Sequence, residues 1–182
     1  MRSICLLQSF ILLCASLNEI ASVRLLKFTN VKCKDLPTTN GFTKYEYCHL
    51  KVVRRNYVEL SLKVNLLQLP ITNLTCRLQC FQRTDGYRPF LYNVHFDFCK
   101  LMAAQKNYDL SFERFVFGAI RTHSNFNQSC PWKESYMMVE KYALDFTKIN
   151  MPVPAGVYRL DFTFYAYGIP RTLTQVFFEK IE

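Results

Sequence analysis

The sequence lacks the residue patterns that define most enzymes and metal proteins. It has only 3 histidines, and His49, His95 and His123 do not lie at a spacing typical of a metal site. The absence of any CxxC pair argues against a structural zinc site. His123 and Ser124 are neighbours, but no third group is placed to orient a nucleophile and its base. The sequence therefore predicts a protein without catalytic activity, bound metal or cofactor.

Long apolar runs are confined to the N-terminus. Residues 1–3 make a short basic start, residues 4–17 are mostly apolar, and Ala21 and Ser22 offer small side chains for cleavage. This order is typical of a signal peptide, which we place at residues 1–22. After it, charged or polar residues interrupt every apolar stretch, so no transmembrane segment is expected in the mature chain. We expect a secreted, extracellular protein.

No low-complexity linker, repeat or change of composition divides residues 23–182, which we interpret as a single domain with a hydrophobic core. The net charge is +9, and the densest basic cluster is formed by Lys51, Arg54 and Arg55. Scattered basic charge on an exported protein is typical of a solvated surface and favours anionic partners such as lipid headgroups or glycans. Nucleic acid is not expected as a partner, because no binding motif occurs.

Alternation of apolar and polar residues is the main structural signal. Over residues 90–98 one face carries Phe90, Tyr92, Val94, Phe96 and Phe98. Similar alternation over 57–67 and 157–167, and apolar runs at 25–31, 74–81, 135–144 and 172–181, predict further strands. The runs 57–67, 74–81 and 88–99 are joined by short turns, which predicts an antiparallel meander. The expected fold is mainly β, an antiparallel sandwich or cup of two sheets.

A helical excursion interrupts the strands at residues 101–122. Phe112, Phe115, Val116 and Ala119 recur at helical spacing, and residues 101–105 also suit a short helical turn better than a strand. We expect this helix to pack on the core over an edge or end of a sheet.

Six cysteines follow the signal peptide, an even number that predicts disulfides but allows 15 pairings. Cys33–Cys48 and Cys99–Cys130 are the preferred pairs. Cys76 and Cys80 share a strand face about 13 Å apart and cannot bond to each other; each is buried or meets a partner elsewhere. Sequons at Asn73 and Asn127 predict glycosylation and require both asparagines to face solvent.

Several blocks together carry a family resemblance. They are residues 28–33, Cys48, Asn56, residues 85–93 with 97–100, residues 124–131 and residues 154–158. In these blocks the chain resembles an insect family of small secreted proteins, expanded in flies and catalogued as a domain of unknown function. Cys76 and Cys80 depart from it, since the family usually has apolar residues there. The family is similar to chemosensory B proteins and, more distantly, to ML-type lipid-recognition domains such as the ganglioside activator.

The resemblance implies an ML-type, immunoglobulin-like sandwich with a lipid cavity between its sheets. The implied function is a secreted carrier of a lipid, fatty acid, cuticular hydrocarbon or pheromone, with a chemosensory role and an extracellular receptor among its implied partners. The inner faces of the expected strands then supply candidates for the cavity wall: Leu60, Leu62, Val64, Leu78, Phe90, Tyr92, Val94, Phe96, Leu160, Phe162 and Phe164.

Two alternatives stay open at this point. Each of these side chains could equally fill a solid core, and the protein would then be a secreted protein-interaction module in immunity or reproduction. A cavity larger than a few hundred Å³ would favour the carrier.

Overall fold

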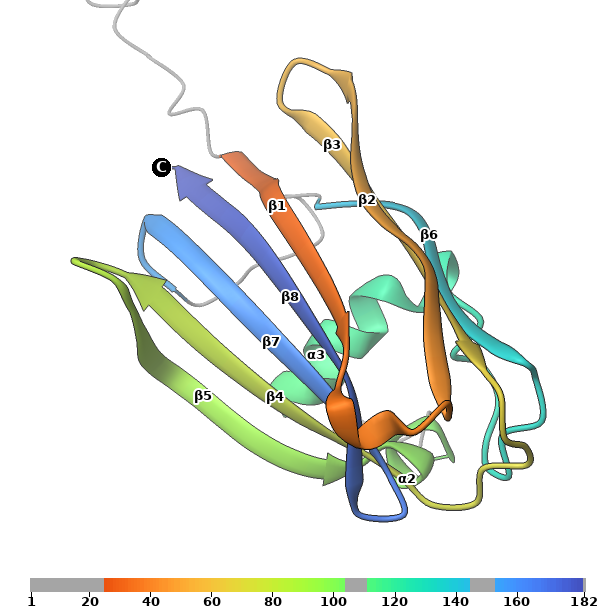
Figure 1. Cartoon of the computed structure of the whole chain (residues 1–182). Coiled ribbons are helices and arrows are strands. Elements are labelled where there is room, and N and C mark those ends of the chain that lie inside the picture. Colours follow the sequence, from red (N-terminus) through yellow and green to blue (C-terminus); the bar gives the residue numbers. More distant parts are fainter. Residues whose placement is uncertain (1–24, 104–110, 145–152, 182) are drawn as a thin grey trace, which may run out of the picture.

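We describe the fold from a computed structural model that covers residues 25–103, 111–144 and 153–181. The expected signal peptide lies outside the described residues. Two antiparallel sheets face each other, as Figure 1 shows with the chain coloured along its length. The predicted mainly β fold with two antiparallel sheets is thereby confirmed.

The larger sheet has five strands in the order β1 (Leu25–Asp35), β8 (Ile169–Ile181), β7 (Gly156–Ala166), β4 (Leu74–Arg83) and β5 (Tyr87–Asp97). Its inner face follows from strict alternation, which sends every second side chain of a strand to the same side. In β4, for example, Leu74, Cys76, Leu78 and Cys80 are buried and the residues between them are not.

The smaller sheet has three strands in the order β2 (Thr43–Arg54), β3 (Tyr57–Leu66) and β6 (Tyr136–Ala143). The sequence predicts no strand at β2, and the structure differs there. A bulge between Tyr45 and Tyr47 shifts the alternation of this strand, and most of its residues are exposed or half-buried. The alternation of apolar and polar residues in β2 is therefore too weak to predict a strand.

The expected meander is wrong at one connection. β3 pairs with β2 and β6, whereas β4 pairs with β5 and β7, so the loop after β3 crosses from one sheet to the other. The other connection of the expected meander, the turn at Asp85-Gly86 between β4 and β5, does join neighbouring strands of one sheet. Alternation identifies a strand but does not identify its partner.

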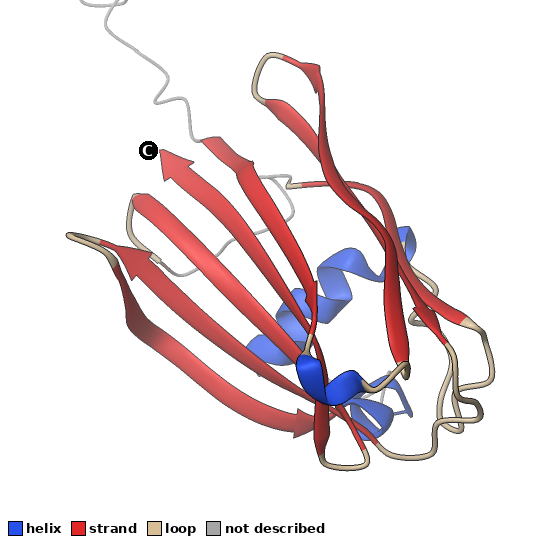
Figure 2. Cartoon of the chain, viewed as in Figure 1, coloured by secondary structure: helices blue, strands red, loops and turns tan. Residues whose placement is uncertain are grey.

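Helices occupy the predicted excursion. The strand that was expected to reach Cys99 ends at Asp97, and Phe98–Ala103 forms the short helix α2. Helix α3 spans Phe112–Ile120 and continues into the 3-10 turn η2 (Arg121–His123). A second 3-10 turn, η1 (Pro37–Thr39), links β1 to β2 (Figure 2). None of the helices in the described ranges is long and apolar enough to cross a bilayer.

Two disulfides join the sheets along opposite edges, and they are the two pairs preferred from the sequence. Cys33–Cys48 connects β1 to β2, and Cys99–Cys130 connects α2, which follows β5, to the segment before β6. Near the first disulfide, Asp35 accepts hydrogen bonds from the Thr43 hydroxyl (2.9 Å) and the Tyr45 amide (3.1 Å). Cys76 and Cys80 are buried free thiols on the inner face of β4. Each disulfide therefore ties the two halves of the sandwich together at one point of its edge.

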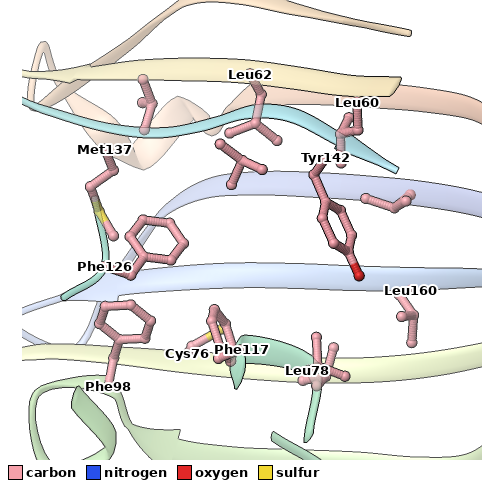
Figure 3. Packing of buried hydrophobic residues seen from close by; sticks show 14 of the residues in the cluster. Leu60, Leu62, Cys76, Leu78, Phe98, Phe117, Phe126, Met137, Tyr142 and Leu160 are labelled. Atoms are coloured by element: carbon pink, nitrogen blue, oxygen red, sulfur yellow. The ribbon is translucent and has the colours of Figure 1, made fainter. Parts of the chain in front are cut away.

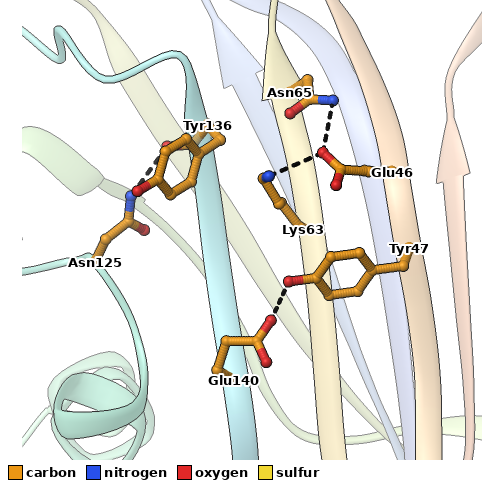
Figure 4. A network of polar contacts seen from close by, with 7 residues as sticks. All are labelled: Glu46, Tyr47, Lys63, Asn65, Asn125, Tyr136 and Glu140. Atoms are coloured by element: carbon orange, nitrogen blue, oxygen red, sulfur yellow. Dashed lines mark hydrogen bonds and ion pairs between the residues drawn. The ribbon is translucent and has the colours of Figure 1, made fainter.

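The hydrophobic core lies between the sheets (Figure 3). Leu60 and Leu62 enter it from β3, Leu160 from β7, and Phe117 from α3. The outer face of the smaller sheet is polar instead (Figure 4). There Glu46 accepts hydrogen bonds from Lys63 (2.9 Å) and Asn65 (3.1 Å). The hydrogen bond from Lys63 is the main reason that the pKa of Glu46 is lowered.

Candidate functional site

An apolar cavity of about 100 Å³ lies between the two sheets and helix α3. Strands of both sheets contribute to its wall, and α3 closes one side. The eighteen lining residues are Phe28, Leu60, Leu62, Phe115, Val116, Phe117, Ala119, Ile120, Phe126, Val139, Tyr142, Leu144, Leu160, Phe162, Phe164, Thr174, Val176 and Phe178.

Helix α3 forms a wall because its apolar residues recur every three or four positions. The ring of Phe117 is the centre of this contact. It meets the rings of Phe98, Phe96 and Phe162 edge-on, with centroid distances of 5.2, 5.7 and 6.0 Å. Such edge-to-face pairs add to the stabilisation from area burial alone. Neither disulfide involves α3. This wall is therefore held by side-chain packing alone, whereas the sheets are also linked by disulfides.

Polar atoms are scarce in the wall. Thr174 and the hydroxyl of Tyr142 are its polar side-chain groups. The Thr174 hydroxyl already forms a 2.7 Å hydrogen bond with the hydroxyl of Tyr45. The arrangement can exclude water from an apolar molecule, and it offers no charged group that would drive a reaction or hold an ionised headgroup.

Tyr45, which forms a hydrogen bond with Thr174 in the wall, makes the stability of the fold depend on pH. Burial raises its pKa from 10.0 to about 12, because the ionised phenol would lose its hydration. The unfolded chain ionises this group near pH 10 and the folded chain does not. We therefore expect the free energy of unfolding to fall as the pH rises from about 10 to 12, by up to about 2–3 kcal/mol from this group. Chemical denaturation across that range should show a smaller decline for Tyr45→Phe than for the parent protein; equal declines would contradict the assignment.

A second, smaller cavity of about 40 Å³ lies farther along the sandwich. Leu62, Phe126, Phe164 and Thr174 line both cavities, so these four side chains separate them.

The structure brings six of the eleven candidate wall residues to a cavity. Leu60, Leu62, Leu160, Phe162 and Phe164 line the larger one, and Val64 lines the smaller one. The other five, which line neither cavity, are Leu78, Phe90, Tyr92, Val94 and Phe96. Leu78 is fully buried in β4.

The aromatic face of β5 packs against α3 and, on its own sheet, against a side chain of β7. Tyr92 stacks on Phe112 with a centroid distance of 3.6 Å, and Phe96 meets Phe117 at 5.7 Å. Phe90 packs on Tyr158 of β7 at 5.7 Å. The physical reason is the difference in width between the sheets. Three strands cannot cover the inner face of five, and α3 covers the part next to β5.

Several cavity residues were missed from the sequence. Helical periodicity predicts that α3 packs on the core, but it does not indicate that the helix lines a cavity. Phe28 in β1 and Val176 and Phe178 in β8 lie in strands that were predicted without assigning an inner face. Phe126 lies in a loop, where no periodic signal exists that could have identified it.

The neighbours His123 and Ser124 have structural partners. His123 Nδ1 lies 3.1 Å from the carbonyl oxygen of Glu140, and its ring packs on Tyr142. The Ser124 hydroxyl donates to the carbonyl oxygen of Arg121 at 3.3 Å. Over the described ranges no three His, Cys, Asp or Glu side chains are grouped to hold a metal ion. Asn73 and Asn127, the sequon asparagines, are both exposed.

Comparison with known proteins identifies a matching family model and similar solved structures. The model of a protein family of unknown function (DUF1091) matches residues 76–160, from β4 into β7. The resemblance to a domain-of-unknown-function family is confirmed over these residues. Among solved structures, the chain is similar to a Niemann-Pick type C2 protein from the Japanese carpenter ant, at 13% identity and a TM-score of 0.32, covering 90% of this chain and 96% of that chain. A comparison with curated proteins finds no match.

Proposed function

We propose that this protein is a secreted carrier of a hydrophobic molecule, such as a lipid, fatty acid, cuticular hydrocarbon or pheromone. The observation that carries the proposal is the apolar cavity between two sheets that disulfides join along both edges. A cross-linked frame keeps the sheets apart while an apolar ligand fills the space between them.

Desolvation of the ligand would supply the affinity. Burial of each methylene group is worth about 0.8 kcal/mol before the costs of association are subtracted. The wall offers hydrocarbon contacts almost everywhere, so the expected ligand is one whose buried part carries no charge. A polar headgroup would have to remain outside the cavity.

The size of the cavity limits the ligand in this conformation. Its volume of about 100 Å³ is below the roughly 300–1,000 Å³ of typical ligand pockets. It is closer to an engineered cavity of about 150 Å³ that takes up benzene. A longer chain therefore requires the cavity to widen, and we propose that α3 moves outward to allow this, because neither disulfide holds it.

Native mass spectrometry of protein secreted from insect cells tests the proposal. A stoichiometric apolar molecule, identified after solvent extraction, would support the carrier. A protein that is empty and also fails to take up offered fatty acids and hydrocarbons would contradict it. That result would favour the alternative of a protein-interaction module with a filled core, which the small cavity volume also favours.

A variant that fills the cavity can be compared with a control variant that carries the same substitution outside it. Val176→Phe adds bulk inside the cavity wall, and we expect it to weaken uptake of a fluorescent fatty acid at least about tenfold by occupying the ligand's space. Val94→Phe makes the same change at a half-buried position that lines neither cavity, and should leave uptake within about threefold of the parent. Equal effects in both variants, measured in a fluorescence titration, would place the ligand elsewhere.

A further inference from the structure

The β2–β3 hairpin extends beyond the rest of its sheet. β6 pairs with β3 only from Glu59 to Asn65, whereas β2 pairs with β3 as far as the Arg54–Tyr57 position. Among the described residues no strand pairs with positions 52–58 from outside the hairpin, and this end of the hairpin projects at the end of the sandwich in Figure 1. We call residues 51–58 the hairpin arm.

The hairpin arm exposes two aliphatic side chains next to each other. Val52 is 72% exposed and Val53 is 50% exposed. A register shift between Val52 and Arg54 leaves Val53 as an extra residue in the ladder, as in a β-bulge. Both valines thus leave at least half of their surface in solvent, and adjacent apolar side chains rimmed by polar residues are a feature of contact sites.

Basic residues flank these valines. Lys51, Arg54 and Arg55 are exposed, and Glu59 is the only acidic residue between positions 51 and 59. Arg54 also lies over the ring of Tyr57, 5.1 Å from its centroid. The arm therefore combines an apolar tip with a net positive charge, which is complementary to an anionic surface.

We propose that the hairpin arm docks on a bilayer that contains anionic phospholipids. Lys51, Arg54 and Arg55 contact the headgroups, and Val52 and Val53 enter the interface between headgroups and acyl chains. A sulfated glycan would be attracted by the same charges but would gain nothing from the valines. The paired exposed valines are the reason that we favour a membrane.

The position of the hairpin arm in the fold agrees with a protein that docks with this end of the sandwich toward the bilayer. Val52 pairs with Val58, which is two residues from Leu60 in the cavity wall. β3 has ten residues and is therefore about 30 Å long. The arm lies at one end of β3, and Asn73 lies in the segment that follows the other end. A glycan on Asn73 would therefore point away from the docked membrane. The proposal does not depend on the carrier function, because docking needs no occupied cavity.

Vesicle flotation of the full secreted chain tests whether the basic residues of the hairpin arm bind anionic phospholipids. The vesicles contain phosphatidylcholine with 30% phosphatidylserine, and pure phosphatidylcholine is the reference. We expect Arg54→Glu with Arg55→Glu to reduce binding to the anionic vesicles at least about tenfold. The control, Lys100→Glu with Lys133→Glu, makes the same charge change at exposed positions away from the arm. Equal losses in the two double variants would overturn the proposal, because only total charge would then matter.

A second pair of variants tests the valines and separates a membrane from a glycan. We expect Val52→Ser with Val53→Ser to weaken vesicle binding at least about fivefold and to leave retention on heparin unchanged. Leu67→Ser with Leu69→Ser is the control, since these leucines are 57% and 40% exposed beyond the other end of β3. Unchanged vesicle binding in the valine variant would overturn the proposal and indicate a polyanion site. Unfolding midpoints of all four variants should match the parent, and uptake of a fluorescent fatty acid, measured separately, reports on the cavity.

Discussion

Replacing Phe96 with aspartate is expected to destabilise the protein by at least about 3 kcal/mol, to abolish ligand uptake and to suppress secretion. Phe96 packs edge-on against Phe117, whose side chain lines the cavity. The substitution removes this aromatic contact and places a carboxylate against apolar rings without a partner. Denaturant unfolding of the protein that is recovered, together with its secreted yield, measures the effect.

His95→Asp is the matched control on the same strand. His95 is exposed and points to the opposite face, where it lies 3.1 Å from the Thr75 hydroxyl and against the ring of Tyr165. Loss of these contacts should cost no more than about 1 kcal/mol. Similar losses at positions 95 and 96 would mean that the two faces of β5 are assigned wrongly.

Removing the Cys99–Cys130 disulfide is expected to have the second large effect. The bond closes a loop with a sequence separation of 31 residues, and chain entropy alone predicts a loss of about 3–4 kcal/mol in Cys99→Ser with Cys130→Ser. The same calculation for Cys33–Cys48, with a separation of 15, predicts about 3 kcal/mol. Both double variants can be measured by denaturant unfolding.

Ligand uptake adds a test that stability alone does not provide. If the disulfides set the distance between the sheets, either double variant should lose fatty-acid uptake under conditions where it remains folded. A variant that stays folded and binds as well as the parent would show that packing alone maintains the cavity.

The strands could be predicted where their alternation is uninterrupted. β5 and β7 show one apolar side chain in two over most of their length, and the structure places both within the predicted ranges or within a few residues of them. β2 was missed because its bulge breaks the alternation. The start of α2 at Phe98 was missed for a different reason, since Phe98 continues the alternation of β5 although the backbone has already turned into a helix.

The candidate site could be predicted only in part. Leu60, Leu62, Leu160, Phe162 and Phe164 lie in the wall of the larger cavity, on inner faces of alternating strands that periodicity can identify. Phe90, Tyr92, Val94 and Phe96 have the same pattern, yet the structure places them outside both cavities. An inner face of a strand can be covered by a facing sheet or by a helix, and periodicity is the same in both cases.

The sequence by itself determined every strand except β2, the apolar face of those strands whose alternation is uninterrupted, and the region of the helices, because these properties depend on residues that are near one another in the chain. Only the tertiary structure decided that β3 and β4 belong to different sheets, that α3 covers β5, and that a cavity remains between them. These features depend on how the shapes of distant side chains fit together. A local pattern of apolar residues contains no information about that fit.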